Sequence, residues 1–295
     1  MRMKKIPEDE VQHLTSLGCQ LGEGPLWHPI EQRLYCVDIE SRSIWRIDPE
    51  SGQAQDYVVD TRVGCLGIRR QGGFVLAGED GFATWDPDTN EISLITNPEA
   101  DRIYARYNDG AVDPAGRFWA GTMTPQGYHS SLYRLDPDFL VHRMETEIGI
   151  SNGIGWSPDQ KTMYFTDSPR KLIYAYDFDV PSGEISHRRI WVDSSEEDGL
   201  PDGLCVDAEG CVWSARWDGW RISRYDPQGQ LMRRIPMPVQ RPTSCAFGSP
   251  QLKTLFITSA WTGLTHAERS AQPMAGDLFY IELDTAGQTA TFFQG

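Results

Sequence analysis

The sequence predicts an all-β protein, a six-bladed β-propeller. A unit made of a turn, a short apolar strand, a polar turn and a second strand recurs six times along the 295 residues, and helical periodicity is sustained nowhere. Equivalent apolar positions stand at 27, 68, 112, 156, 206 and 247, which gives intervals of 41, 44, 44, 50 and 41 residues. Such intervals are typical of propeller blades.

The first recognisable strand of each unit is a short, mostly apolar run. Turn sequences such as Asp113-Pro-Ala-Gly116 and Asp207-Ala-Glu-Gly210 precede these runs, because their residues adopt the backbone angles of a chain reversal. The six runs cover residues 34–39, 74–79, 118–123, 163–168, 212–217 and 255–260.

The second strand of each unit usually ends in an Asp, as in Leu132-Tyr-Arg-Leu-Asp-Pro137. Its six copies cover residues 44–49, 82–87, 132–137, 173–178, 222–227 and 278–283. Flanking segments, such as residues 53–59, bring each unit to about four strands, the number in a propeller blade. A sandwich or a barrel is the alternative, but neither accounts for the same order of elements six times over.

We therefore predict one closed domain over residues 1–295, without linkers. A closed ring leaves no strand edge exposed to other chains. For that reason we expect residues 11–17 to add a strand beside the C-terminal segment at 290–293.

Composition excludes several classes of protein. Lys and Arg number 27 against 42 Asp and Glu, and the net charge of −15 argues against nucleic acid and anionic membrane as partners. No apolar run reaches the roughly 18 residues of a spanning helix. Because acidic residues follow the basic start at Met1 to Lys5, where a secretion signal would be apolar, we expect a cytoplasmic protein. The six cysteines form no CxxC pair and are expected to be buried free thiols.

The blade repeat also predicts which side chains gather at the central channel. The innermost strands of a propeller stand around one axis, so equivalent positions form a ring. Counting back four residues from each apolar position reaches Glu23, Gly64, Asn108, Asn152, Asp202 and Thr243. Four of these six carry a carboxylate or a carboxamide, although strands generally disfavour Asn and Asp.

Two interpretations of this ring remain open. A glycine closely follows each of the four donors, and Asn-Gly and Asp-Gly are common tight-turn dipeptides. Glu is uncommon in tight turns, however, so Glu23 does not fit the turn interpretation. Four oxygen-bearing side chains at equivalent positions favour a cation site. A set of oxygen donors without His or Cys suits a hard ion, with Ca²⁺ expected first and Mg²⁺, Mn²⁺ or Zn²⁺ as alternatives.

Other catalytic signatures are absent or weak. The sequence contains no H-E-x-x-H motif, so a zincin is not expected. Gly149-Ile-Ser151-Asn-Gly153 has the spacing G-x-S-x-G, but the elbow of a serine hydrolase joins a strand to a helix and helical periodicity is sustained nowhere, so a serine hydrolase is not expected either. Arg106 stands just before Asn108 and is either a surface ion-pair member or a residue that holds a polar substrate.

At these positions the sequence resembles the family of gluconolactonase, regucalcin (senescence marker protein) and luciferin-regenerating enzyme. The resemblance runs almost from end to end. It rests on the strings Leu21-Gly-Glu23-Gly-Pro25, Arg106-Tyr-Asn108-Asp-Gly110, Ala120-Gly-Thr-Met123, Ile150-Ser-Asn152-Gly153, Pro201-Asp202-Gly203 and Thr243-Ser-Cys245.

The resemblance implies one divalent cation held by Glu23, Asn152 and Asp202, with Asp202 as the general base. It implies substrate contacts by Arg106 and Asn108. Members similar to regucalcin also have a substrate-contacting Glu where this chain has Gln126, close to Tyr128 and His129. This departure bears on which sugar is preferred.

The implied function is a metal-dependent lactonase that hydrolyses a sugar lactone, gluconolactone-like with a pentose or hexose skeleton, to the aldonic acid. Ca²⁺ is the expected ion, with Zn²⁺, Mn²⁺, Mg²⁺ or Fe²⁺ as alternatives. A broader metal-dependent esterase or organophosphate hydrolase is the second hypothesis, and a non-catalytic calcium-binding propeller is the third. The sequence leaves the sugar, its ring size, the metal and the oligomeric state open.

Overall fold

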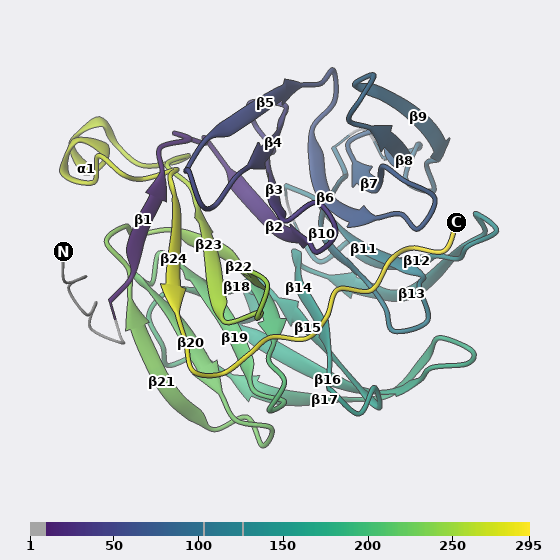
Figure 1. Cartoon of the computed structure of the whole chain (residues 1–295). Helices are drawn as coiled ribbons and strands as arrows, with labels where there is room; N and C mark the ends of the chain where they lie inside the picture. Colours follow the sequence, from purple (N-terminus) through teal and green to yellow (C-terminus); the bar gives the residue numbers. More distant parts are fainter. Residues whose placement is uncertain (1–9, 103, 126) are drawn as a thin grey trace.

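The computed structural model describes residues 10–102, 104–125 and 127–295. These residues form six four-stranded antiparallel sheets arranged around one axis (Figure 1), which is the predicted six-bladed β-propeller. In this part of the chain no helix combines the length and the apolar character that crossing a membrane requires.

The first strand of each blade lies next to the central axis, where it contacts the first strands of the neighbouring blades. All six positions predicted from the repeat lie in these strands. The first strands are β2 (Gly22–His28), β6 (Val63–Ile68), β10 (Arg106–Val112), β14 (Ser151–Trp156), β18 (Leu200–Val206) and β22 (Pro242–Gly248).

The second and third strands of each blade coincide with the two sets of runs recognised in the sequence. The second strands are β3 (Arg33–Asp38), β7 (Phe74–Gly78), β11 (Phe118–Met123), β15 (Thr162–Asp167), β19 (Val212–Trp217) and β23 (Thr254–Ser259). The third strands are β4 (Ser43–Ile47), β8 (Gly81–Asp86), β12 (Ser130–Leu135), β16 (Leu172–Asp179), β20 (Arg221–Tyr225) and β24 (Leu278–Glu282).

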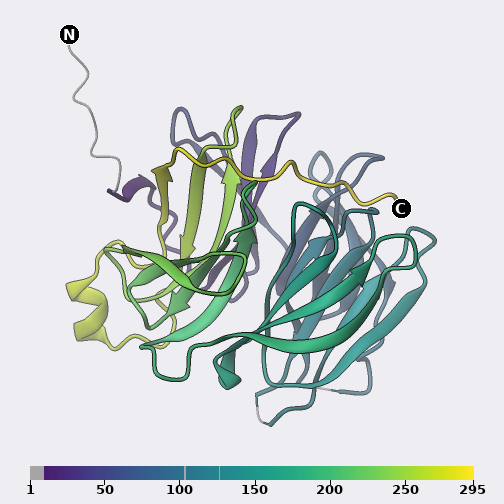
Figure 2. The same cartoon turned by 90° about the horizontal axis from the view of Figure 1, so that it is seen from below.

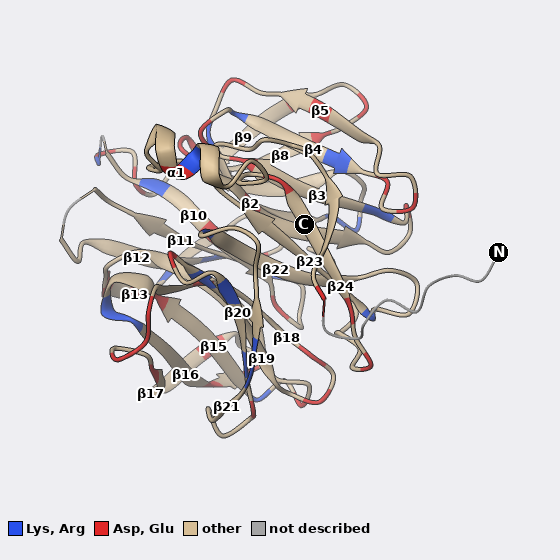
Figure 3. Cartoon of the chain, turned by 90° about the vertical axis from the view of Figure 1, so that its left-hand side faces the viewer, with Lys and Arg blue, Asp and Glu red and all other residues tan. Residues whose placement is uncertain are grey.

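The outer strands carry most of the polar surface. They are β5 (Ala54–Val58), β9 (Glu91–Thr96), β13 (Val141–Ile148), β17 (Glu184–Asp193), β21 (Leu231–Pro236) and β1 (Gln12–Thr15). Two short helices, η1 (Ser168–Arg170) and α1 (His266–Ala271), lie in connections between strands. Figure 3 shows Asp and Glu distributed over several blades rather than gathered in one patch.

The apolar core lies between the blades, because the first and second strands are covered on both faces. In two blades a buried Asp fixes the turn that precedes the second strand. Asp113 accepts a hydrogen bond from the indole of Trp119 at 2.9 Å and pairs with Arg117 at 2.6 Å. Asp207 accepts one from the indole of Trp213 at 2.9 Å and pairs with Arg224 at 2.7 Å.

The ring closes differently from the sequence-based expectation. Strand β1, within the predicted segment 11–17, pairs antiparallel with β24, so that His13 stands opposite Phe279. It does not pair with residues 290–293. The expectation was wrong because β24 is the last strand of its blade in sequence and leaves the outer position of that sheet free for β1.

The segment near the C-terminus instead covers one end of the channel. Residues 287–294, here called the strap, run across the ends of several first strands (Figures 1 and 2). The Gln288 side chain donates hydrogen bonds to the carbonyls of Trp156 at 2.8 Å and Val206 at 3.3 Å, and the Phe293 N–H donates to Ile68 at 2.8 Å. The opposite end, where the first strands begin, is called the mouth below.

Candidate functional site at the channel mouth

Each first strand is irregular at the position where the repeat predicted a site residue. In all six first strands the pairing register with the second strand shifts within two residues of that position, which marks a β-bulge or a related irregularity. In β18, for example, Pro201 pairs with Arg216 but the next paired residue is Leu204. Bulges redirect side chains and are common next to binding sites.

The glycines beside the donors serve close packing between blades rather than tight turns. Gly153 and Gly203 lie inside strands and do not have a positive φ. A Cβ atom on Gly153 would lie 2.6 Å from the backbone nitrogen of Leu204, and one on Gly203 would lie 2.1 Å from the hydroxyl of Ser244. The turn interpretation is therefore wrong for these two positions, although Gly24 does adopt a φ of +53°.

A chain of hydrogen bonds connects three blades at the mouth. Arg106 donates to Oδ1 of Asn108 at 2.7 Å, and Nδ2 of Asn108 donates to Oδ1 of Asn152 at 2.9 Å. Nδ2 of Asn152 donates to the hydroxyl of Ser168 at 2.8 Å, and this hydroxyl donates to the carbonyl of Pro201 at 2.6 Å. The amide oxygen of Asn152 is thereby turned away from Ser168 and toward Asn108.

Arg106 is a buried cation with spare hydrogen-bonding capacity. It donates to its neighbours Tyr107 and Asn108, and among the described residues no ion pair includes it. Burial lowers its pKa to about 10, although Glu40 and Glu23 oppose this shift. The guanidinium therefore stays charged at neutral pH and can hold an oxygen-rich ligand.

Glu23 and Asp202 are buried carboxylates without an ion-pair partner among the described residues. Their exposed fractions are 6% and 4%, and no ion pair of the described residues involves either of them. Burial raises the pKa of Glu23 well above its ordinary value, and the charges of Asp202 and Asp109 raise it further. Burial and the charge of Asp109 likewise raise the pKa of Asp202.

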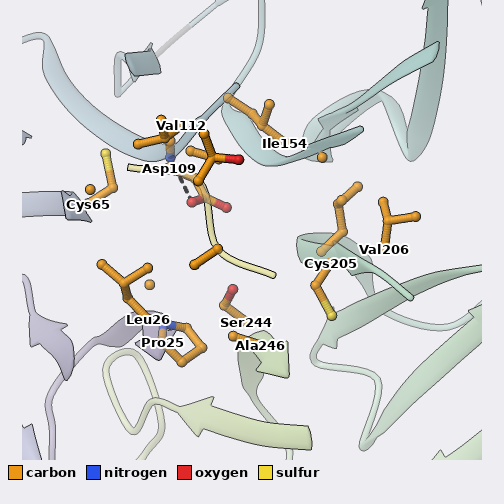
Figure 4. Close-up of a pocket in the computed structure, with 18 of the residues that line it drawn as sticks. Pro25, Leu26, Cys65, Asp109, Val112, Ile154, Cys205, Val206, Ser244 and Ala246 are labelled. Atoms are coloured by element: carbon orange, nitrogen blue, oxygen red, sulfur yellow. Dashed lines mark hydrogen bonds between the residues drawn. The ribbon is translucent and has the colours of Figure 1, made fainter. Parts of the chain in front are cut away.

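Two further residues of the site were missed by the sequence reasoning. Asp109 lies in the bulge after Asn108, and its carboxylate faces the channel cavity of about 240 Å³ below the mouth (Figure 4). One of its oxygens accepts a hydrogen bond from the Gly110 N–H at 2.7 Å, and burial raises its pKa to about 6. Ser168 orients Asn152. Its only signal in the sequence is its position at the end of a second strand, on the mouth side.

The structure gathers five of the six site residues predicted from the sequence. Arg106, Asn108 and Asn152 are joined by hydrogen bonds, and Glu23 interacts electrostatically with both Asp202 and Arg106. Gln126, the sixth, lies outside the described residues. Tyr128, near it, is 45% exposed and stacks against the Arg170 guanidinium, whose carbon lies 4.1 Å from the ring centre.

The donor set fits a hard divalent cation. Two buried carboxylates with raised pKa values and an oriented amide oxygen stand on the first strands of three blades, and burying carboxylate charges without an ion-pair partner is costly. Glu23, Asn152 and Asp202 are the residues that could supply oxygen ligands. A different group, Asp207, Glu209 and Cys211, also brings its ligand atoms within 4.8 Å of one another. There the guanidinium of Arg224 already pairs with both carboxylates, at 2.7 Å from each, so we interpret that group as a structural ion-pair cluster.

Comparison with known proteins is consistent with this geometry. Residues 21–261 match the region described as SMP-30/Gluconolactonase/LRE-like. A regucalcin of Gallus gallus is 38% identical over 270 residues, which cover 89% of this chain and 90% of the relative. A pentonolactonase of Haloferax volcanii is 39% identical over 286 residues, covering 94% and 96%.

The fold similarity extends over nearly the whole chain. The crystal structure of a calcium-binding protein, regucalcin, from Agrobacterium tumefaciens has a TM-score of 0.93 and 27% identity, and covers 97% of this chain and 98% of that one. The matched region includes all five described residues at the mouth. The chain therefore belongs to the SMP-30/gluconolactonase/LRE-like family.

Proposed function

We propose that this protein is a metal-dependent sugar lactonase that opens a small aldonolactone to the aldonic acid. Its similarity to a pentonolactonase and its membership of a family that includes gluconolactonases support the lactonase class.

The observation that carries this proposal is the pair of buried carboxylates without a cation. Glu23 and Asp202 come from different blades and are more than nine-tenths buried. A divalent cation between them and the amide oxygen of Asn152 would balance their charge. Ca²⁺ is our first choice, because the donors are all oxygen and because a structural relative is described as calcium-binding.

Each residue at the mouth has a proposed role. Asp202 accepts a proton from the water that attacks the lactone carbonyl, as a general base. Arg106 donates a hydrogen bond to a sugar oxygen. Asn108 Oδ1 accepts one from a sugar hydroxyl, since both hydrogens of its Nδ2 are used by Ser151 and Asn152. Together they hold the ring in place, which lowers the entropic part of the barrier. When bound, the cation would polarise the carbonyl, stabilise the developing negative charge and keep the two carboxylates ionised. Ser168 positions Asn152.

The test is hydrolysis of a panel of pentono- and hexonolactones by metal-free protein supplied separately with Ca²⁺, Mn²⁺, Zn²⁺, Mg²⁺ or Fe²⁺. We expect activity that chelation removes and that Asp202→Asn lowers by at least about 10³-fold, the effect of losing a base and a charge at the metal. The control is Glu209→Gln. Glu209 is an exposed residue in the turn after β18, at the end of the strand opposite the mouth, so this variant keeps full activity. Activity that survives both chelation and Asp202→Asn would refute the mechanism.

Two alternatives are separated by the same assay. If aryl esters or organophosphates are hydrolysed faster than any lactone, the protein is a broader hydrolase. If no substrate is hydrolysed while Ca²⁺ still binds with a stoichiometry of one and binding requires Asp202, the protein is a calcium-binding propeller. A cytoplasmic location is also part of the proposal, and cell fractionation tests it.

A further inference from the structure

The channel below the mouth contains a second pair of side chains suited to a metal. Cys205 in β18 and Cys245 in β22 belong to neighbouring blades, and their sulfur atoms lie 3.7 Å apart. Both residues line the cavity of about 240 Å³ that also contains Asp109. Cys245 is 2% exposed, whereas Cys205 keeps part of its surface open to the cavity. The proposed lactonase mechanism uses neither thiol.

The two thiols are in hydrogen-bond contact, and the separation of their sulfurs also suits a shared metal ion. Both cysteines are free, and 3.7 Å is far longer than a disulfide bond of about 2.05 Å. A zinc-type ion binds thiolate sulfur at about 2.3 Å, and tetrahedral geometry then separates two sulfur ligands by about 3.8 Å. The pair is thus spaced as one edge of a tetrahedral metal site before any ion binds.

We propose that Cys205 and Cys245 form a binding site for a thiophilic divalent cation, such as Zn²⁺ or Cd²⁺, inside the channel. This site is distinct from the oxygen-donor site at the mouth, because soft thiolates and hard carboxylates select different ions. The proposal does not depend on the lactonase activity.

The residues around Cys205 and Cys245 determine how many protein ligands the ion would have. No third His, Cys, Asp or Glu of the described residues brings a ligand atom close enough to complete a cluster with the two sulfurs. The other coordination positions therefore face the cavity, which has room for water. Cys65 lines the same cavity but lies across it from Cys205 (Figure 4). A site with two protein ligands binds its ion exchangeably, and ion binding releases the thiol protons.

A bound ion would connect two blades close to the mouth. Cys205 lies three residues after Asp202 in the same strand, and Cys245 lies two residues after Thr243. Bridging β18 and β22 stabilises the native state by mass action, because the unfolded chain does not hold the two sulfurs at this distance. Binding of Cd²⁺ is therefore expected to raise the thermal midpoint.

The test is a titration of the full chain with Cd²⁺, followed by the ultraviolet charge-transfer absorption of cadmium thiolate. Excess Ca²⁺ and a phosphine reductant are present, so that the mouth is saturated and the thiols stay reduced. We expect one Cd²⁺ per chain with this absorption. The signal disappears in Cys205→Ser and in Cys245→Ser, and it persists in Asp202→Asn, because an oxygen-donor site gives no thiolate absorption.

Two matched variants complete the design. Cys36→Ser removes a fully buried thiol in another blade, close to Cys19, and Cys211→Ser removes the thiol whose sulfur lies 3.8 Å from that of Met232. Both should keep the signal. Persistence in the Cys205 or Cys245 variants, loss in Cys211→Ser, or no signal in folded wild type overturns the proposal. If a serine variant fails to fold, the corresponding alanine variant, checked by near-ultraviolet circular dichroism, decides.

Discussion

At the scale of single residues, the buried carboxylates around the channel destabilise the native state when they are ionised. Asp109 is the clearest case, because its only described hydrogen bond comes from the adjacent Gly110 N–H and it faces a cavity lined mainly by apolar side chains. Its pKa of about 6 compares with about 3.9 for an Asp in an unfolded chain. Between these two values the native state holds a proton that the unfolded state has lost. The free energy of unfolding therefore falls as the pH rises from about 4 to about 6.

The first prediction concerns this residue. In the presence of a metal chelator, Asp109→Asn should raise the free energy of unfolding at pH 7 by about 2 to 3 kcal/mol, since raising the Asp109 pKa from about 3.9 to about 6 costs about that much. Near pH 4 the variant and the wild type should be almost equally stable. Urea unfolding at pH 4, 5, 6 and 7 measures the difference. Asp88→Asn, at an exposed turn, is the control, and a less stable Asp109→Asn at pH 7 would contradict the prediction.

The residue scale also shows what the sequence could reveal of the site. Glu23, Asn152 and Asp202 were found by counting along the repeat, and Arg106 and Asn108 gained their roles from the family resemblance. Asp109 was missed because a strict alternation of side chains points Asn108 and Asp109 to opposite faces. The irregular pairing between Tyr107 and Gly110 brings both toward the centre. A local bulge leaves no sign in residue types alone.

At the scale of elements, the first strands approach one another more closely than ordinary side chains permit. The hypothetical Cβ of Gly153 would meet the backbone nitrogen and Cγ of Leu204 at 2.6 Å each. The nitrogen cannot yield easily, because it belongs to the backbone of the strand that carries Asp202. The glycines thus set the distance between the strands that carry Asn152 and Asp202.

The second prediction tests this spacing. Gly153→Ala should lower the free energy of unfolding by about 2 to 3 kcal/mol through overpacking, and it should weaken metal binding at the mouth. Gly72→Ala is the matched control, because nothing lies within 4 Å of its added methyl group. It carries only the strain of a φ of +97°, about 1 to 2 kcal/mol, and should leave metal affinity unchanged. Urea unfolding and calorimetric titration measure the two effects. Equal metal affinity in both variants would count against the role of Gly153.

The third prediction concerns the turns before the second strands. Asp207 accepts hydrogen bonds from two backbone N–H groups and from the indole of Trp213, and it pairs with Arg224. Asp207→Asn leaves the Arg224 charge partly uncompensated and should lower the free energy of unfolding by about 3 kcal/mol. The metal stoichiometry should not change, because this acidic group is structural. Loss of a bound ion in Asp207→Asn, with Glu209→Gln as the mild control, would identify a metal site instead.

At the scale of the whole molecule, the strap connects blades that share no strand. Gln288 reaches the carbonyl of Trp156 in one blade and that of Val206 in the next, and Phe293 is fully buried against a third. The strap also forms part of the cavity wall through residues 288–291. It thereby covers part of the channel at the end opposite the mouth.

The fourth prediction tests the contribution of the strap. Gln288→Ala removes the donor to two carbonyls and should lower the free energy of unfolding by about 1 to 3 kcal/mol. Gln294→Ala is a fair comparison, since its side chain bonds only to Phe292 within the strap and at the surface. That variant should stay within about 0.5 kcal/mol of the wild type. Thermal and urea unfolding measure both, and equal effects would contradict the prediction.

The architecture was more predictable than its closure. Six repeats of strand and turn residues were sufficient for the propeller, because each blade repeats the same local pattern. The partner of β1 was predicted wrongly, since edge pairing depends on which strand lacks a neighbour in three dimensions and both candidate partners read as plausible strands. A single domain over residues 1–295 stays a prediction.

The pairing of β1 with β24 has a kinetic consequence. The ring of His13 contacts the carboxylate of Asp277 across 264 positions of the chain. Closing a loop of that length costs about 5 kcal/mol of free energy through lost chain entropy, and this cost precedes any stabilisation by the contact. The sixth blade should therefore assemble late during folding, and slowly, as expected for high contact order. Until then the bare edge of β24 is the place where two copies of the chain would aggregate.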